Sequence, residues 1–293
     1  MSEGFDSGGV PALPMPQQYH QLLAAATRYT TPCGDGEMVW HHWGQRKAGA
    51  LPLVMLHGGS GSWTHWLRNI EVLVAAGYEL WLPDLPGFGD SAAPPTGFDA
   101  DAMVEPLYQG MQQLGVLPCQ LVGFSFGGMT AGLLAAAHPD VAARLVLVGA
   151  PAMGVVPHKQ FTLRGWRHLP DVDRQRDIHR YNLGALMLWD SAKIDDEALA
   201  LHEHNVLRDR MPRRRASGTD VLAQALPQIQ VPVAAIYGAH DALYKTYIGA
   251  LGDKFRTVTP QLLDFVLVPD SGHWVQYEQA DAFSAALQRV LQA

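Results

Sequence analysis

The sequence predicts one α/β domain, in which helices cover both faces of a twisted, mostly parallel sheet. Short, wholly apolar runs alternate with segments of helical character along most of the chain. Such runs are typical of parallel strands that are buried on both faces. The chain has 293 residues, enough to bury a large core, and one long stretch near its middle interrupts the alternation. We therefore expect a single domain with an insertion.

The expected elements follow from apolar runs and turn residues. A short helix is expected at 19–27, and the alternating segment 38–44 predicts a strand. Strands buried on both faces are expected at 51–56, 78–83, 119–122, 144–148, 231–237 and 265–268. Helices are expected at 63–76, 99–115 and 128–138, with a last one near the end of the chain. Gly77 is expected to end the first of these helices.

The most informative motif is the run Gly123-Phe124-Ser125-Phe126-Gly127. It lies between an expected strand and an expected helix, which is the setting of a nucleophile elbow. In such a turn the glycines let strand and helix approach each other, and the serine hydroxyl stands at the carboxyl edge of the sheet. The motif predicts that Ser125 is a nucleophile.

Two further residues follow in the chain order of a hydrolase triad, namely nucleophile, acid and histidine. Asp241 comes after the strand expected at 231–237, and His273 comes after the last expected strand. Two other segments, HGGSGSW at 57–63 and DLPGFGDS at 84–91, complete the pattern. With these motifs the chain resembles the α/β-hydrolase superfamily over roughly residues 38–291.

The resemblance implies a role for each of these residues. Ser125 would attack the substrate, His273 would act as the base, and Asp241 would orient the imidazole. The backbone N–H groups of Gly59 and Phe126 would stabilise the oxyanion.

Other residues of the same types are weaker candidates. Asp270 lies only three residues before His273, so we prefer Asp241 as the acid. Asp84 and Asp90 belong to a segment that is usually architectural in this superfamily. We expect His57 to be a structural residue of its turn rather than a base.

The interruption of the alternating pattern predicts a lid. About 80 residues separate two expected strands, and a simple crossover needs far fewer. Because the superfamily commonly inserts a cap at this point, residues 153–218 are interpreted as a helical lid between core segments 19–152 and 219–293. An ordinary insertion away from the site is the alternative. Residues 1–18 are expected to form a flexible tail.

The composition narrows the classes of partner. The net charge of −7 disfavours nucleic acid, and no run approaches the roughly 20 apolar residues of a membrane span. The two cysteines have no metal-ligand spacing and favour a cytoplasmic location. No metal motif or cofactor fingerprint is present, so neither a metal nor a cofactor is expected.

The cluster 213–215, Arg-Arg-Arg, is interpreted as a solvated face. The oligomeric state stays open.

The partner is expected to be a small apolar molecule, because large apolar residues lie near the catalytic positions and in the expected lid. The expected substrate-binding residues are Trp63, Met153, Trp189 and Trp274. Trp166 and Met187 of the expected lid are further candidates. Each of these residues is also a common core residue, which is the alternative interpretation.

The last motif offers a choice of reaction. Residues 272–280, GHWVQYEQA, resemble the terminal motif of carbon–carbon hydrolases that cleave meta-cleavage products of aromatic rings. Those enzymes tend to have a cysteine before the Gly-His pair and an Arg-Trp pair in the lid that binds a carboxylate. Here Ser271 takes the place of the cysteine, and the comparable lid segment 201–208 lacks the pair.

The sequence therefore predicts a serine hydrolase that cleaves a small or medium apolar carboxylic ester through an acyl-enzyme. Carbon–carbon hydrolysis is the first alternative. A small-molecule-binding protein with little turnover is the second, since a fold alone does not determine function. A serine at the nucleophile position argues against haloalkane dehalogenases and epoxide hydrolases, which use a carboxylate there.

Overall fold

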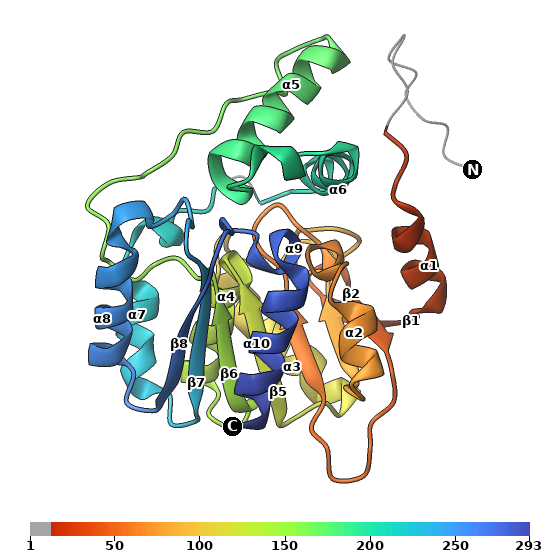
Figure 1. The fold of residues 1–293 in the computed structure, drawn as a ribbon. Helices are drawn as coiled ribbons and strands as arrows, with labels where there is room; N and C mark the ends of the chain where they lie inside the picture. The colour runs from red at the N-terminus through yellow and green to blue at the C-terminus, as the bar shows by residue number, and fades with distance from the viewer. Residues whose placement is uncertain (1–12, 212) are drawn as a thin grey trace.

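The computed structural model describes residues 13–211 and 213–293, and its centre is an eight-stranded sheet (Figure 1). The strands lie in the spatial order β1-β2-β4-β3-β5-β6-β7-β8. Their bounds are β1 Thr27–Cys33, β2 Gly36–Trp43, β3 Leu53–Leu56, β4 Leu80–Pro83, β5 Cys119–Phe124, β6 Ala142–Val148, β7 Val233–Gly238 and β8 Leu262–Val268. β1 and β2 pair antiparallel, as do β2 and β4, and the remaining pairs are parallel. The expected mostly parallel sheet is confirmed.

The edge strand β1 is the one described strand that the apolar pattern did not predict. It pairs with β2 through a tight turn in which Gly34 has a φ of 54°. Most of its side chains are exposed or half-buried, and only Thr31 and Cys33 are buried. Pro32 is tolerated because an edge strand has one row of backbone groups without a neighbouring strand. A strand of this kind carries no apolar run from which it could be recognised.

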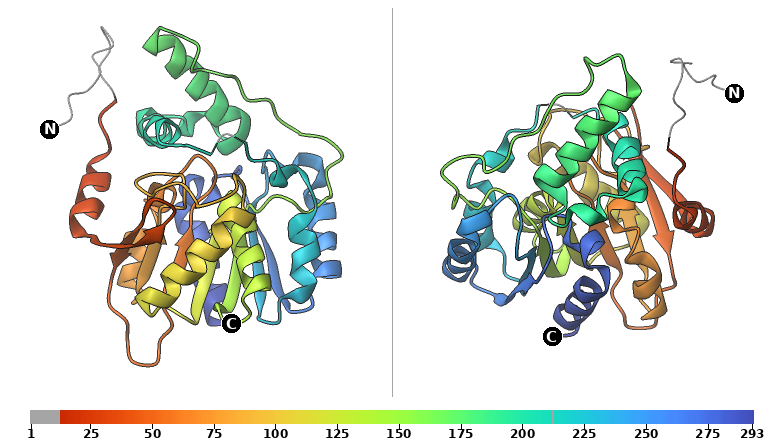
Figure 2. Two further views of the ribbon diagram at one scale, coloured as in Figure 1. Left: turned by 180° about the vertical axis from the view of Figure 1, so that it is seen from behind. Right: turned by 45° about the horizontal axis from the view of Figure 1, so that its top comes forward.

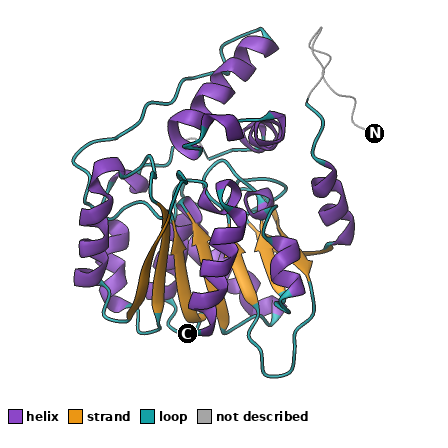
Figure 3. Ribbon diagram, in the orientation of Figure 1, coloured by secondary structure: helices purple, strands orange, loops and turns teal. Residues whose placement is uncertain are grey.

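Helices cover both faces of the sheet (Figure 3). The described α-helices are α1 Gln17–Ala25, α2 Ile70–Ala75, α3 Asp101–Leu114, α4 Phe126–Ala137, α5 Val172–Asn182, α6 Asp196–Leu207, α7 Val221–Ala225, α8 Ile248–Val258, α9 Val275–Glu278 and α10 Ala280–Gln292.

Two boundaries differ from the sequence prediction. The single helix expected at 63–76 is divided into a 3₁₀ turn, Trp63–Trp66, and α2, and Gly77 with a φ of 92° follows the helix as expected. α1 begins at Gln17, inside the segment predicted to be a tail. The first twelve residues of that segment lie outside the described residues.

The core consists of two apolar clusters, one on each face of the sheet. Successive side chains of a strand point to opposite faces, and β3 shows this directly. Leu53 and Met55 belong to the cluster under α2 and α10, whereas Val54 and Leu56 belong to the cluster under α3 and α4. Burial of each side chain of this size contributes about 1.5–3 kcal/mol to the stability of the fold. The sheet is therefore a stable support for the loops at its carboxyl edge.

The chain between β6 and β7, residues 149–232, is called here the insertion. It contains α5, a π-helical turn at Leu183–Met187 and α6, and these lie over the loops at one end of the sheet (Figure 2). The Asp171 carboxylate caps α5 by accepting from the N–H groups of Asp173 and Arg174, and Asp195 caps α6 in the same manner. The lid predicted at 153–218 falls within this insertion, and both its bounds and its function stay predictions.

Three further features concern the described residues as a whole. Their helices are all too short or too polar to cross a membrane. No group of three or more His, Cys, Asp or Glu side chains in this part of the chain is arranged to hold a metal ion. Cys33 and Cys119 are both buried and free.

Candidate active site

Ser125 stands at the sharp turn between β5 and α4. Its φ of 50° and ψ of −117° are unfavourable for a residue with a side chain, as is usual at a nucleophile elbow. The flanking glycines are required by close packing. A Cβ atom on Gly123 would collide with the carbonyl of Gly127, and one on Gly127 would collide with the carbonyl of His57. The sequence therefore folds into a turn that leaves the Ser125 side chain partly exposed.

Ser125, His273 and Asp241 are joined by two hydrogen bonds. The distance from Ser125 Oγ to His273 Nε2 is 2.8 Å, and His273 Nδ1 lies 2.9 Å from Asp241 Oδ2. With the proton on Nδ1, the imidazole donates to the carboxylate and Nε2 accepts from the hydroxyl. Asp241 and His273 are both buried. This geometry lets a base remove the serine proton while an anion holds the imidazole.

Asp270 does not reach the imidazole. Its side chain is exposed, and its backbone carbonyl accepts a hydrogen bond from Gln279 Nε2 at the surface. The structure therefore brings Asp241, the acid that the sequence analysis preferred, to His273 and leaves Asp270 in solvent.

The two residues expected to form an oxyanion hole lie side by side. Phe126 is the first residue of α4, so its N–H has no acceptor within the helix. A Cβ atom on Gly59 would lie 3.5 Å from Phe126 Cβ, and one on Gly58 would lie 3.2 Å from Ser125 Cβ. The segment 57–63, called here the glycine-rich loop, thus packs directly against the elbow. Its role as an oxyanion donor stays a prediction.

A family model described as the alpha/beta hydrolase fold matches residues 52–189. The chain has the α/β-hydrolase fold. The matched segment begins just before β3 and extends into the insertion, so it contains the elbow and the glycine-rich loop. Together with the relatives described next, it establishes that the chain is a hydrolase.

Curated relatives match along nearly the whole hydrolase. A 2-hydroxy-6-oxononadienedioate/2-hydroxy-6-oxononatrienedioate hydrolase from Paraburkholderia phymatum is 28% identical over 279 residues, which cover 90% of this chain and 95% of the relative. The protein of the same name from Escherichia coli is 25% identical over 283 residues, with 90% and 95% covered.

Solved structures share the fold. A meta-cleavage product hydrolase from Pseudomonas fluorescens superposes with a TM-score of 0.73 at 20% identity, covering 90% of this chain and 97% of that one. A thermophilic esterase from Thermogutta terrifontis superposes with a TM-score of 0.68 at 23% identity, covering 91% and 98%. At these identities the likeness shows the fold alone.

Two histidines of the hydrolase support the glycine-rich loop rather than the reaction. His57 Nε2 accepts from the N–H of Leu85 at 2.8 Å, and His57 Nδ1 donates to the carbonyl of Gly58 at 2.7 Å. His65, which the sequence analysis did not select, accepts from the N–H of Gly58 at 3.1 Å. Burial lowers the pKa of both imidazoles, so both are neutral at pH 7.

Two tryptophans expected at the pocket lie in packed regions instead. Trp63 is 3% exposed and stacks on Tyr19 of α1, with ring centroids 5.4 Å apart. Trp274 is 1% exposed and stacks on Tyr277 at 4.1 Å. Neither side chain lines any of the four cavities described here. The structure gives no support to their predicted contact with substrate, because both are enclosed by other aromatic rings.

The other two expected substrate-binding residues line separate cavities. Met153 lines a cavity of about 370 Å³ next to the end of β6. Trp189 is 51% exposed, stacks on His240 with centroids 4.0 Å apart, and lines a wider cavity of about 1170 Å³. They therefore do not form one pocket.

A third cavity, of about 560 Å³, reaches the glycine-rich loop and is called here the loop cavity. Its lining residues are Gly59, Ser60, His65, Leu163, Arg164, Gly165, Trp166, Arg167, His168, Asn182, Leu186, Met187, His202, Val206 and Asp209. Of the cavities described, it is the one that includes the expected oxyanion donor Gly59. The insertion supplies most of its wall, Trp166 and Met187 among them.

The loop cavity is more positive than the apolar pocket that the sequence predicted. Arg164 stacks over the Tyr181 ring, and Arg167 donates to the carbonyl of Val206 at 3.0 Å. Within the described residues, neither arginine forms an ion pair with a carboxylate. Burial lowers the pKa of His202 to about 3, so this neighbour adds no charge at neutral pH. The two arginines favour a substrate that carries an anionic group.

Met187→Ala should change which substrates the hydrolase prefers, because it enlarges the loop cavity next to the site. We expect relative kcat/KM to move toward substrates with a bulkier group on the reacting carbonyl, measured over a series of increasing chain length. Trp189→Ala is the matched control, since Trp189 lines a different cavity and should leave this selectivity unchanged. Equal selectivity in both variants and the wild type would show that the substrate binds elsewhere.

A buried carboxylate that the sequence analysis did not select joins the loop that carries His273 to the insertion. Glu278 Oε2 accepts from the N–H of Gly272 at 2.6 Å, and its Oε1 accepts from the N–H of Asp190 at 2.7 Å. The N–H of Trp274 donates to the carbonyl of Met187 at 2.8 Å. The residue that follows His273 is therefore bonded directly to the insertion.

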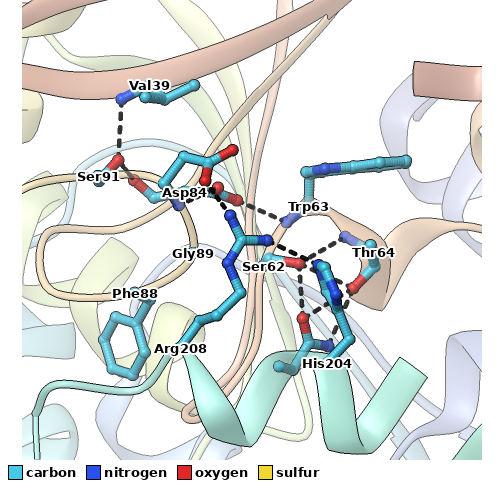
Figure 4. Close-up of polar contacts among 12 residues, drawn as sticks. Val39, Ser62, Trp63, Thr64, Asp84, Phe88, Gly89, Ser91, His204 and Arg208 are labelled. Carbon is cyan, nitrogen blue, oxygen red and sulfur yellow. Dashed lines mark hydrogen bonds and ion pairs between the residues drawn. The ribbon is translucent and has the colours of Figure 1, made fainter. Parts of the chain in front are cut away.

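The end of α6 is tied to loops of the core (Figure 4). Arg208 forms an ion pair with Asp90, and its Nη1 lies 2.6 Å from His204 Nε2. Asp84 accepts from the N–H groups of Trp63 and Asp90, which supports the architectural role expected for its segment.

The basic cluster is only partly a solvated face. Arg213 and Arg215 are exposed, as expected. The Arg214 side chain is 21% exposed and pairs with Asp209 at 2.9 Å, so the prediction was wrong for this residue. Its guanidinium turns inward because the Asp209 carboxylate accepts two parallel hydrogen bonds from it in fork geometry.

Proposed function

We propose that this hydrolase cleaves the carbon–carbon bond next to a ketone in a carboxylate-bearing product of aromatic ring fission, of the 2-hydroxy-6-oxo-dienedioate type. The observation that carries the proposal is the set of curated relatives with that substrate in their names, which match along about nine-tenths of the chain. The comparisons favour this reaction over the ester hydrolysis that the sequence analysis put first. The two arginines of the loop cavity are compatible with a dicarboxylate substrate.

The reaction would begin with addition of Ser125 Oγ to the ketone carbon. His273 Nε2 takes the hydroxyl proton, and Asp241 stabilises the imidazolium that results. The carbonyl oxygen becomes an oxyanion, which accepts hydrogen bonds from the N–H groups of Gly59 and Phe126. The short Ser125–His273–Asp241 chain supports this order of events.

Collapse of the tetrahedral intermediate would break the carbon–carbon bond. This cleavage requires the 2-keto tautomer of the substrate, in which the 2-hydroxyl proton has moved to the carbon next to the ketone. The electron pair of the broken bond is then delocalised into the conjugated 2-keto group as a dienolate, and His273 returns the serine proton to that fragment. A water molecule then adds to the acyl-enzyme after losing a proton to His273. The products are a carboxylic acid and a 2-hydroxydienoate, and Ser125 regains its hydrogen.

Ester hydrolysis is the second candidate. Two sequence features favour it, namely Ser271 in place of cysteine and the absence of an Arg-Trp pair at 201–208. The same triad would serve, with an alcohol as the leaving group in place of the dienoate.

A direct comparison of two substrate classes tests the proposal. The wild type is assayed with a 2-hydroxy-6-oxo-dienedioate and with a panel of p-nitrophenyl acyl esters, and Ser125→Ala is the blank for both. We expect a kcat/KM of about 10⁴ M⁻¹s⁻¹ or more for the dienedioate, the lower end of the range for enzymes on their own substrates. Efficient ester turnover without dienedioate cleavage would favour the second candidate.

A further inference from the structure

The turn that follows Gly59 is held by a residue of the insertion. Ser60 has a φ of 52°, a conformation that side-chain-bearing residues rarely adopt. Its hydroxyl donates to Asp209 Oδ2 at 2.5 Å and accepts from Arg214 Nη2 at 3.0 Å. Asp209 and Arg214 belong to the insertion, about 150 residues further along the chain. The unfavourable turn is therefore stabilised by contacts from outside its own loop.

Asp209 and Arg214 form a two-pronged ion pair. Nη1 lies 2.9 Å from Oδ1, and Nη2 lies 3.0 Å from Oδ2. The N–H of Met211 also donates to Oδ1 at 2.8 Å. The Asp209 side chain is 10% exposed. Burial alone would raise the pKa of this carboxyl, but the hydrogen bonds and charge of Arg214 outweigh burial and lower it, so the pair stays ionised at neutral pH.

The same guanidinium packs against both expected oxyanion donors. Arg214 Cζ lies 5.6 Å from the centre of the Phe126 ring and 5.0 Å from that of Phe88. A Cβ atom on Gly59 would lie 3.6 Å from Arg214 Nε and Nη2. The pair thus lies behind the two residues whose N–H groups are expected to meet the oxyanion.

We propose that the Asp209–Arg214 pair positions the oxyanion hole by holding the turn at Ser60, so that the Gly59 N–H is directed at the reacting oxygen. Asp209 and Arg214 act through Ser60 and Gly59, so they are positioning residues. Asp209 also lines the loop cavity, and product binding is therefore measured beside boronate binding. The insertion then completes the catalytic geometry in addition to enclosing the substrate. This inference rests on the nucleophilic role proposed for Ser125.

A positioning role predicts a particular kinetic effect. The oxyanion exists only in the transition state and the intermediate, so loss of the pair should lower kcat and leave KM nearly unchanged. Misplacement of a reacting group by 1 Å can cost about 10²-fold in rate. We expect a fall of about tenfold to about 10²-fold in kcat for Arg214→Gln and for Asp209→Asn.

The experiment compares these two variants with Arg213→Gln, which removes the exposed neighbouring arginine. A fluorophosphonate first counts the reactive sites, so that each kcat refers to folded enzyme. Two inhibitors are then compared: an alkyl boronic acid, whose serine adduct places a tetrahedral oxygen in the oxyanion hole, and the carboxylate product, which forms no adduct. We expect Arg214→Gln and Asp209→Asn to weaken boronate binding about as much as they lower kcat, with product binding little changed. Arg213→Gln should resemble the wild type.

The outcomes separate this inference from the proposed function. Wild-type kcat per reactive site and wild-type boronate affinity in both variants would overturn the positioning role while leaving the Ser125 mechanism intact. Equal losses for boronate and product would also overturn it, because they would indicate general disruption of the site. Arg214→Lys, which keeps the charge but loses the fork, should lose less kcat than Arg214→Gln. A wild type that no fluorophosphonate labels would overturn the proposed nucleophile, and this inference with it.

Discussion

Replacing Ser125 with alanine should lower kcat by as much as about 10⁶ on whichever substrate the wild type turns over. The hydroxyl lies 2.8 Å from His273 Nε2, and alanine removes the atom that would add to the carbonyl carbon. Initial rates at saturating substrate measure the loss. A fluorophosphonate should label the wild type at Ser125, as identified by peptide mass spectrometry, and should leave the variant unlabelled.

Ser191→Ala provides the control, since Ser191 is exposed on the insertion and should leave kcat unchanged. Near wild-type turnover by Ser125→Ala would remove the nucleophile from the account. Stoichiometric ligand binding with no turnover by the wild type would favour the small-molecule-binding alternative.

Asp241→Asn should lower kcat by roughly 10⁴. The carboxylate holds His273 through a 2.9 Å contact to Nδ1 and is completely buried. An amide in its place can donate to Nδ1, and the imidazole proton then lies on Nε2. A protonated Nε2 cannot accept the proton of Ser125. Steady-state rates and thermal melting together show whether the loss is catalytic rather than a loss of folded protein.

Asp270→Asn is the matched control for this substitution. Asp270 lies in the same region of the chain as His273 but has an exposed side chain, so kcat should change little. A larger loss in Asp270→Asn than in Asp241→Asn would reverse the assignment of the acid.

The parts of the fold that were predictable are those with a local apolar signal. The strand ending at Leu56 is buried on both faces and is continuously apolar. β1 was missed because an edge strand exposes most of its side chains. The helix expected at 63–76 was predicted too long. Trp63 and Trp66 lie three residues apart, which is the spacing of a helix face, but they are buried by tertiary packing in a 3₁₀ turn.

The candidate site was predictable where residues follow strands. Parallel strands end at one edge of a sheet, so the loops that carry Ser125, Asp241 and His273 had to lie close together. Contacts between the insertion and the core carry no local signal. Arg214 resembles any solvated arginine in the sequence, and its carboxylate partner is recognised only after the chain has folded.

The pocket residues were the least predictable part of the site. Large apolar side chains line pockets and fill cores alike, so Trp274 and Trp189 gave the same signal in the sequence. In the structure, the first is enclosed beside Tyr277 and the second is half-exposed against His240. Spatial arrangement alone distinguishes these cases.

Product analysis in oxygen-18-labelled water shows directly whether the enzyme hydrolyses the carbon–carbon bond. The hydrolase is incubated with the 2-hydroxy-6-oxo-dienedioate, and the products are identified by mass spectrometry. We expect cleavage of the bond next to the ketone, with one labelled oxygen in the new carboxylic acid and none in the 2-hydroxydienoate, and no products from Ser125→Ala. Recovery of the intact dienedioate from an enzyme preparation that a fluorophosphonate labels at Ser125 would contradict the proposed reaction.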